Sequence, residues 1–316
     1  MGSAASSRGI TRQLAKATGG RCLAVNYRLA PQAPFPAAIL DVLTVYMSLL
    51  YPPAGSLHTA VSASQIVLVG ESHGGALALA VLQVLLSINR QHSVQSLTFH
   101  GATVARPIMI PAGVSVVSPE GVKVGCLPDY KGNLHLDILQ GSSSPPIMPD
   151  FPACAVWPTN PPRGETYCET SMLSHPLVSL VLAEQWAKSP PLYIACGEER
   201  WRDSAQLIAQ NAARQGVKVC FEEYEAMCHM FIVFYPKMRQ ASMCIQNWAK
   251  FCVDCVEGST EEGACMVDVS TLERRRRDVR NLNRLSTKQT RDLIEKETST
   301  TKPWTGKGEH IEKASL

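Results

Sequence analysis

Residues 70–74 read Gly-Glu-Ser-His-Gly and match the pattern Gly-x-Ser-x-Gly. An apolar run typical of a buried strand, 66–69, precedes them, and an apolar helical run, 76–86, follows. At a sharp turn from strand to helix, glycines leave room for strained backbone and expose the serine oxygen. The helix N-terminus adds positive potential where an oxyanion would form. We therefore predict that Ser72 is the nucleophile of an acyl-transfer site; a glycine-rich turn with a capping serine is the alternative.

A serine hydroxyl is a weak nucleophile, so it needs a base, and the base needs an acid to hold it in one tautomer. In hydrolases built on this turn, the chain order is serine, acid, histidine. Of the eight histidines, only His229 and His310 follow the last predicted strand, and His310 lies in a polar tail. His229 lies in a loop between a strand and a helix and is the predicted base. A histidine of the core or of a helix cap is the alternative.

The acid is expected in the loop after a predicted strand at 192–195. This loop contains three carboxylates, Glu198, Glu199 and Asp203. Spacing alone does not choose between Glu199 and Asp203. Asp203 also stands where it could begin the helix that follows, which would be a purely structural role.

The elements that must position these residues alternate between strand and helix. Short β-rich runs are separated by helical patterns, which favours an α/β fold with a mostly parallel sheet and helices on both faces. The predicted strands span 22–27, 65–69, 114–117, 192–195 and 218–224, and the predicted helices span 10–17, 37–50, 74–89, 204–215 and 234–255. Gly216 stands where a left-handed cap would end the fourth helix.

Two regions break the alternation. Residues 126–176 contain many prolines and little periodicity, which is typical of a cap or lid inserted into a hydrolase domain that we expect to span 1–257. Residues 258–316 are polar and are expected to be a disordered tail. From residue 271 to the end there are twelve Lys or Arg and seven Asp or Glu, a net charge of +5; because the whole chain carries +3, residues 1–270 carry −2. The run 274–277 is interpreted as a solvated charge run, with a nuclear signal or an anion-binding patch as the alternative.

Composition excludes several classes of protein. The chain has 316 residues, of which 45% are hydrophobic and 18% charged, as in ordinary globular proteins. Its longest apolar stretch is too short to span a bilayer, and the body lacks the basic surface that would indicate a nucleic-acid partner. The eleven cysteines are odd in number and lack zinc-type spacing. Without a signal-peptide pattern, we expect an intracellular, cytosolic protein with reduced thiols and no bound metal.

Taken together, the motifs of this sequence resemble those of the hormone-sensitive-lipase branch of the α/β-hydrolases, and in particular its fungal esterase or lipase-like members. The similarity covers about residues 8–256 and lies in four ordered segments: Tyr-Arg-Leu-Ala-Pro from 27, Gly-Glu-Ser-His-Gly-Gly from 70, Gly-Glu-Glu from 197 with Asp203, and Tyr-Glu-Ala-Met-Cys-His from 224. The family places its acid four positions before the aspartate that opens the next helix. The resemblance therefore implies Glu199 as the acid and Asp203 as the helix-side residue.

Two departures from the family pattern affect the oxyanion site. His73 replaces the common alanine; its backbone N–H can still donate to an oxyanion, although its side chain could crowd the site. The family's His-Gly-Gly-Gly segment, which supplies the remaining donors, does not occur in this sequence. Losing one such donor typically costs about 10²–10³ in turnover. We expect the chain to be an N-terminally truncated form of a longer hydrolase, which translation of the upstream DNA would test.

The resemblance implies a carboxylic ester hydrolase that forms an acyl-enzyme on a small or medium apolar ester, with no cofactor. A catalytically impaired relative that binds a small molecule is the first alternative, because the oxyanion segment is absent. An acyltransferase of secondary metabolism is the second, because it would use the same three residues. The sequence predicts neither the oligomeric state nor the acyl and alcohol groups.

Overall fold

The computed structural model describes residues 3–91, 93, 95–124, 126–133 and 155–303. Its main sheet has six strands in the order β1-β4-β5-β6-β7-β8. The first five strands are parallel: β1 (Val67–Glu71), β4 (Gly113–Val117), β5 (Leu192–Gly197), β6 (Val219–Tyr224) and β7 (Gly263–Val267). The last, β8 (Arg274–Arg277), is antiparallel to β7. The predicted α/β fold with a mostly parallel sheet is confirmed.

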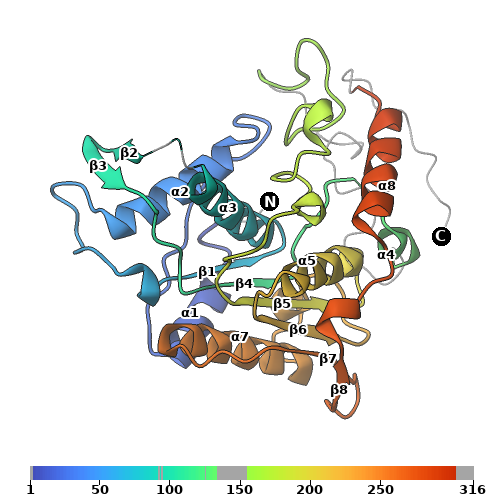
Figure 1. Ribbon diagram of the computed structural model, residues 1–316. Helices are drawn as coiled ribbons and strands as arrows, with labels where there is room; N and C mark the ends of the chain where they lie inside the picture. Colours follow the sequence, from blue (N-terminus) through green and yellow to red (C-terminus); the bar gives the residue numbers. More distant parts are fainter. Residues whose placement is uncertain (1–2, 92, 94, 125, 134–154, 304–316) are drawn as a thin grey trace.

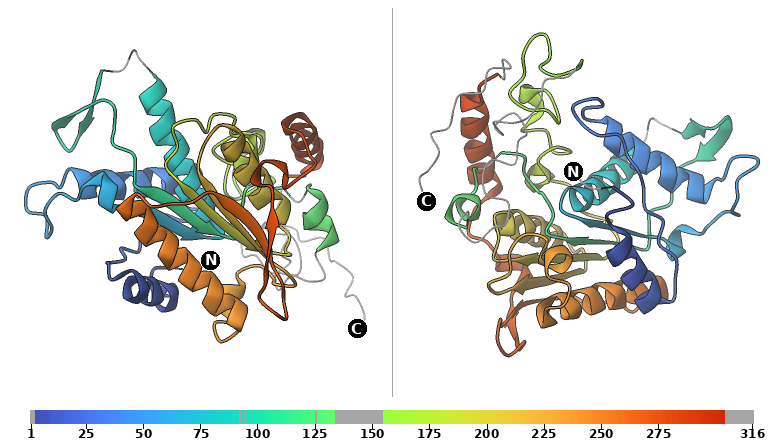
Figure 2. Two further views of the ribbon diagram at one scale, coloured as in Figure 1. Left: turned by 60° about the horizontal axis from the view of Figure 1, so that its bottom comes forward. Right: turned by 180° about the vertical axis from the view of Figure 1, so that it is seen from behind.

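Helices cover both faces of this sheet (Figure 1). On one face lie α2 (Ala37–Leu50), α3 (His73–Arg90) and α5 (Arg202–Arg214); on the other lie α1 (Arg8–Thr18) and α7 (Arg239–Glu257). Figure 2 shows the same two layers from other directions. The remaining elements are α4 (Pro128–Gly132), α6 (Phe231–Phe234), α8 (Thr287–Thr300), the short 3-10 turns Ala63–Gln65, Thr170–Met172, Leu180–Leu182 and Val279–Asn281, and a separate hairpin of β2 (Ser96–Phe99) and β3 (Ala102–Ala105).

The central strands carry apolar side chains on both faces, as expected where helices cover a sheet twice. All residues of β4 and β5 are buried. Two hydrophobic clusters result, one between the sheet and α2, α3 and α5, and the other between the sheet and α1 and α7. Among the described residues, each helix is too short or too polar to cross a membrane.

Most predicted elements match the structure to within a few residues, and the strand predicted over 22–27 is wrong. Residues 22–27 do not form a strand, because no described strand lies beside them to complete a hydrogen-bond ladder, and most of them are exposed. The helix predicted over 234–255 is α7, which begins five residues later, at Arg239, because Pro236 lacks the N–H that a continuous helix needs. Gly216 has φ of 81°, as the predicted left-handed cap requires.

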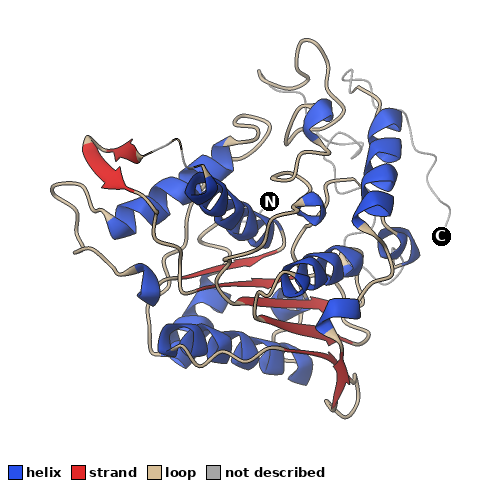
Figure 3. Cartoon of the chain, viewed as in Figure 1, coloured by secondary structure: helices blue, strands red, loops and turns tan. Residues whose placement is uncertain are grey.

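The expected disordered tail differs most from the structure. Residues 263–300 contain β7, β8 and α8, and β7 extends the main sheet beside β6 (Figure 3). The low average hydrophobicity of this segment predicted disorder. A few apolar side chains are nevertheless enough to pack it against the rest of the protein, since Val267 and Ile294 are fully buried. Residues 304–316 lie outside the described residues, as does 134–154, the middle of the predicted cap. The described part of that cap contains α4 and the loop from 155, with the 3-10 turn at Thr170–Met172.

Candidate active site

The nucleophile turn lies between β1 and α3. Ser72 has φ of 51° and ψ of −123°, a conformation that L-residues rarely adopt. The turn closes so tightly that a Cβ on Gly70 would lie 2.3 Å from the carbonyl oxygen of Gly74. A Cβ added at Gly74 would meet nothing within 4 Å. Of the two glycines, Gly70 alone is therefore required to make room for the turn. The strained turn predicted around Ser72 is therefore present, and Ser72 stays partly accessible.

Three predicted residues converge at the carboxyl ends of the parallel strands. The Nε2 atom of His229 lies 2.8 Å from Oγ of Ser72, and its Nδ1 atom is hydrogen-bonded to Oε2 of Glu199. His229 and Glu199 are both fully buried. An ionised carboxylate only accepts hydrogen bonds, so Nδ1 carries the hydrogen and Nε2 presents its lone pair to the serine hydroxyl. This arrangement can activate the hydroxyl as a nucleophile.

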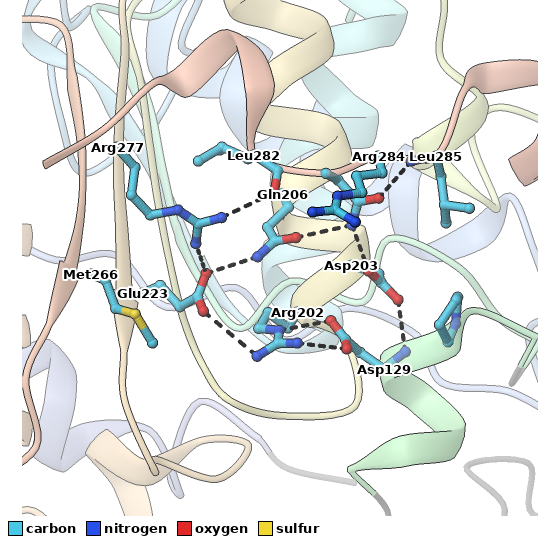
Figure 4. A pocket seen from close by; sticks show the side chains of 12 residues that line it. Asp129, Arg202, Asp203, Gln206, Glu223, Met266, Arg277, Leu282, Arg284 and Leu285 are labelled. Carbon is cyan, nitrogen blue, oxygen red and sulfur yellow. Dashed lines mark hydrogen bonds and ion pairs between the residues drawn. The ribbon is translucent and has the colours of Figure 1, made fainter. Parts of the chain in front are cut away.

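Asp203, the alternative acid, bonds to α4 and to the C-terminal segment. It accepts hydrogen bonds from the backbone N–H of Asp129, at 2.7 Å, and from the side-chain amide of Asn283, at 2.5 Å. Burial raises the pKa of the Asp203 carboxyl, and these bonds oppose that effect. Figure 4 shows Asp203 among the side chains that line a pocket of about 480 Å³ beside α5. The pocket contains none of Ser72, Glu199 and His229, so Asp203 belongs to a polar junction between α4, α5 and the C-terminal segment.

Glu198, the remaining carboxylate of the loop, joins the acid loop to the histidine loop. It accepts a hydrogen bond from the backbone N–H of Ala226 at 2.9 Å and lies 3.4 Å from Arg202. The two loops also touch directly, because a Cβ on Gly197 would lie 2.0 Å from the carbonyl oxygen of Met227. Only glycine permits that approach. Sequence reasoning listed Glu198 but assigned it no role, since its partner is a backbone group in a distant segment.

The backbone around the nucleophile leaves one N–H available. The N–H of Ser72 donates to the carbonyl oxygen of Val117 at 3.0 Å. The N–H of His73 begins helix α3, so it lacks an acceptor within the helix, and no described residue supplies one. The predicted oxyanion donor is therefore a free N–H next to the serine.

Aromatic rings surround the site. The ring of Trp201 lies 4.5 Å from that of His229, and Tyr130 packs edge-on against Trp201 at 5.8 Å. On the other side, Tyr167 of the cap region lies 5.0 Å from the ring of His73. Burial lowers the pKa of His73, and the charge of Lys123 lowers it further. The pKa of Glu71, which precedes the serine, is raised by burial. Sequence reasoning missed Trp201, Tyr130 and Tyr167, since isolated aromatic residues carry no spacing signal.

Comparisons with known proteins agree with this architecture. An acetyl-hydrolase of Streptomyces hygroscopicus is 27% identical over 255 residues, which cover 78% of this chain and 69% of that protein. The versiconal hemiacetal acetate esterase stcI of Emericella nidulans is 29% identical over 244 residues, covering 76% of this chain and 73% of that one.

Solved structures share the fold. An esterase/lipase from an uncultured bacterium has a TM-score of 0.62 at 23% identity, and an esterase from the bacterial hormone-sensitive lipase family has 0.62 at 24%; each covers 81% of this chain and 73% of the other. A family model described as alpha/beta hydrolase fold matches residues 1–233, which include Ser72, Glu199 and His229. The chain therefore belongs to the α/β-hydrolase fold family, in the hormone-sensitive-lipase-like branch that its motifs indicate.

Proposed function

We propose that this protein is a carboxylic ester hydrolase that works through an acyl-enzyme on Ser72. The observation that carries the proposal is the continuous hydrogen-bonded chain from Ser72 through His229 to Glu199. Ester hydrolysis at the level of the family is supported by the two curated relatives, whose names describe an acetyl-hydrolase and an acetate esterase.

The proposed mechanism follows from the roles of these groups. Ser72 attacks the ester carbonyl while His229 takes its proton, and the N–H of His73 donates to the oxyanion of the tetrahedral intermediate. His229 then gives the proton to the leaving alcohol, and water attacks the acyl-enzyme in the same way. Glu199 holds His229 in the required tautomer and stabilises its charged form. No cofactor takes part in this sequence of steps.

The substrate that we propose is a small or medium apolar ester, with a short acyl group such as acetyl. The aromatic rings of Trp201, Tyr130 and Tyr167 around the site favour an apolar ligand over a charged one. Both curated relatives have names that specify a two-carbon acyl group. We therefore expect p-nitrophenyl acetate and butyrate to be cleaved faster than the esters of long-chain acids.

Labelling with a fluorophosphonate probe tests the nucleophile. The wild-type protein should gain one label on Ser72. Ser72→Ala should abolish the labelling and lower kcat for p-nitrophenyl acetate by at least about 10⁴-fold. Ser64→Ala, which changes an exposed serine before β1, is the matched control and should leave both unchanged. Unchanged labelling of Ser72→Ala would refute the assignment.

A second candidate is a protein of the same fold that binds an apolar small molecule without hydrolysing it. The observation that favours this candidate is that the described residues supply one free oxyanion donor beside Ser72, the N–H of His73. Equilibrium binding of a p-nitrophenyl ester without release of p-nitrophenol would establish it over the hydrolase. Transfer of the acyl group to an added alcohol in preference to water would instead indicate an acyltransferase.

A further inference from the structure

His73 has a side chain where the family commonly has only a methyl group, and that side chain is anchored. Its Nδ1 atom lies 2.9 Å from the ammonium of Lys123 and 3.3 Å from Oε2 of Glu120. Lys123 and Glu120 pair with each other at 2.5 Å. The three side chains are only 26%, 13% and 18% exposed for His73, Lys123 and Glu120, so they form a compact polar cluster beside the nucleophile.

The chemistry of the cluster determines the state of the imidazole. An ammonium group only donates hydrogen bonds, so the bond from Lys123 requires the lone pair of Nδ1, which places the ring hydrogen on Nε2. The pKa of His73 is lowered by burial and by Lys123, which agrees with a neutral ring. For Glu120, burial alone would raise the carboxyl pKa, but the charge of Lys123 holds it well below its usual range. A neutral histidine between a cation and an anion is the result.

The same loop that anchors the imidazole also holds the backbone of Ser72. The N–H of Glu120 donates to the carbonyl oxygen of Ser72 at 3.3 Å, and the N–H of Ala76 donates to the same oxygen at 3.1 Å. This carbonyl and the N–H of His73 belong to one planar peptide group. Because Ser72 has a positive φ, its conformation persists only where neighbouring groups hold it. Glu120 thus contacts this peptide directly through its backbone and indirectly through Lys123 and the His73 side chain.

The cluster also contacts the cap region. The ammonium of Lys123 lies 4.5 Å from the centroid of the Tyr167 ring, within the range of a cation–π interaction. The Tyr167 ring packs edge-on against His73. All three hydrogens of the Lys123 ammonium therefore have a partner: Glu120, His73 and Tyr167. Lys123 is committed to these internal contacts rather than to a ligand.

We propose that His73, held by Lys123, which Glu120 anchors in turn, is a positioning residue that keeps the Ser72–His73 peptide oriented so that its N–H points at the substrate oxyanion. This inference rests on the proposed ester hydrolysis. An oxyanion contact is made mainly in the transition state, so loosening it should lower kcat and kcat/KM equally and leave KM unchanged. Losing a donor outright costs about 10²–10³, so a donor that is merely less well held should cost about tenfold.

The test compares His73→Ala with His73→Asn on a p-nitrophenyl ester. Asparagine can place its side-chain oxygen near the position of Nδ1, where it can accept from Lys123, whereas alanine cannot. We expect His73→Ala and Lys123→Met each to lower kcat about tenfold at constant KM, and His73→Asn to recover most of that loss. The double variant His73→Ala/Lys123→Met should lose no more than either single variant, because both break the same contact.

Three results would overturn the inference. An alanine variant that is as active as the wild type, or more active, would show that the imidazole only crowds the site. Equal losses in the alanine and asparagine variants, or additive losses in the double variant, would show that the Lys123 contact is irrelevant. In each case a wild type that is active and labelled on Ser72 leaves the proposed function standing, whereas an inactive, unlabelled wild type overturns the proposed function and this inference together.

A second readout does not depend on turnover. The imidazole nitrogens of His73, observed by 15N NMR at pH 7, should report a neutral ring with the hydrogen on Nε2, and Lys123→Met should raise the pKa of that ring. A doubly protonated ring, or a pKa unaffected by Lys123→Met, would contradict the proposed contact. Thermal melts of each variant, within a few degrees of the wild type, establish that the comparison is between folded proteins.

Discussion

At the scale of single residues, the acid loop shows how neighbouring carboxylates take different roles. Glu198, Glu199 and Asp203 all follow β5, and each has a different partner: the N–H of Ala226, the imidazole of His229, and the N–H of Asp129. Glu199 and Asp203 are four residues apart, which is about one helical turn. Asp203 lies within α5, whereas Glu199 precedes α5 and can reach the strand ends. The chemistry of the three side chains is similar, so their positions in the chain decide their roles.

This distinction predicts different outcomes for two matched substitutions. Glu199→Gln should lower kcat by about 10³–10⁴, because an amide can donate to Nδ1 and so favours the wrong tautomer of His229. Asp203→Asn should leave kcat within about threefold, since an amide oxygen can still accept from Asp129. Steady-state kinetics with p-nitrophenyl acetate measures both. A large loss in Asp203→Asn together with an active Glu199→Gln would reverse the assignment of the acid.

At the scale of elements, the arginine-rich run 274–277 is mostly exposed, as expected of a charge run, but it also forms strand β8 and is part of the fold. Successive side chains of a strand point to opposite faces, so Arg274 and Arg277, three residues apart, lie on opposite faces of the sheet. Arg274 contacts Glu222 on one face, and Arg277 lies 2.5 Å from Glu223 on the other. Both glutamates are buried in β6, with β7 between them and β8. The strand therefore neutralises two adjacent buried carboxylates.

Neutralisation of Glu222 predicts a difference between two arginines of the same strand. Arg274→Met should lower the free energy of unfolding by about 1–3 kcal/mol, because Glu222 would lose its cation and keep only neutral donors. Arg276→Met, at an exposed position, should change it by less than about 0.5 kcal/mol. Urea denaturation monitored by tryptophan fluorescence measures both values. Equal effects of the two substitutions would show that the Glu222 contact does not stabilise the sheet.

At the scale of the whole molecule, the C-terminal segment connects the sheet to the cap region. After β7 and β8 the chain runs across α5, where Asn283 bonds to Asp203 and Gln206, and continues into α8. α8 lies beside the cap region (Figure 1), where its Glu297 lies 3.7 Å from Lys131 of α4, and its Arg291 pairs with Glu184 at 3.0 Å. The polar segment therefore packs along the α5 side of the molecule.

Integration of this segment predicts its hydrogen-exchange behaviour. The amides of β7 should exchange about as slowly as those of β6, because the two strands share one ladder of hydrogen bonds. A disordered tail would exchange within seconds. Mass-spectrometric hydrogen exchange with peptides covering 219–224 and 263–267 makes the comparison within one sample. Fast exchange in the second peptide alone would restore the interpretation as a disordered tail.

The sequence by itself determined the alternation of strand and helix, the nucleophile turn and the order serine, acid, histidine, because these depend on local periodicity and on short motifs. Such signals involve residues that are neighbours in the chain, and the structure brings Ser72, Glu199 and His229 together as their order predicts. The sequence also identified His73 as unusual, but it contained no information about the direction of that side chain.

Only the tertiary structure decided which carboxylate faces His229, what anchors His73, and whether the polar C-terminal segment folds. Each of these depends on partners far away in the chain: Glu120 and Lys123 for His73, and Glu222 for Arg274. A charged side chain is read from sequence as solvated, since burial of an unpaired charge is costly. The pairing that offsets this cost exists only after the strands have been brought together.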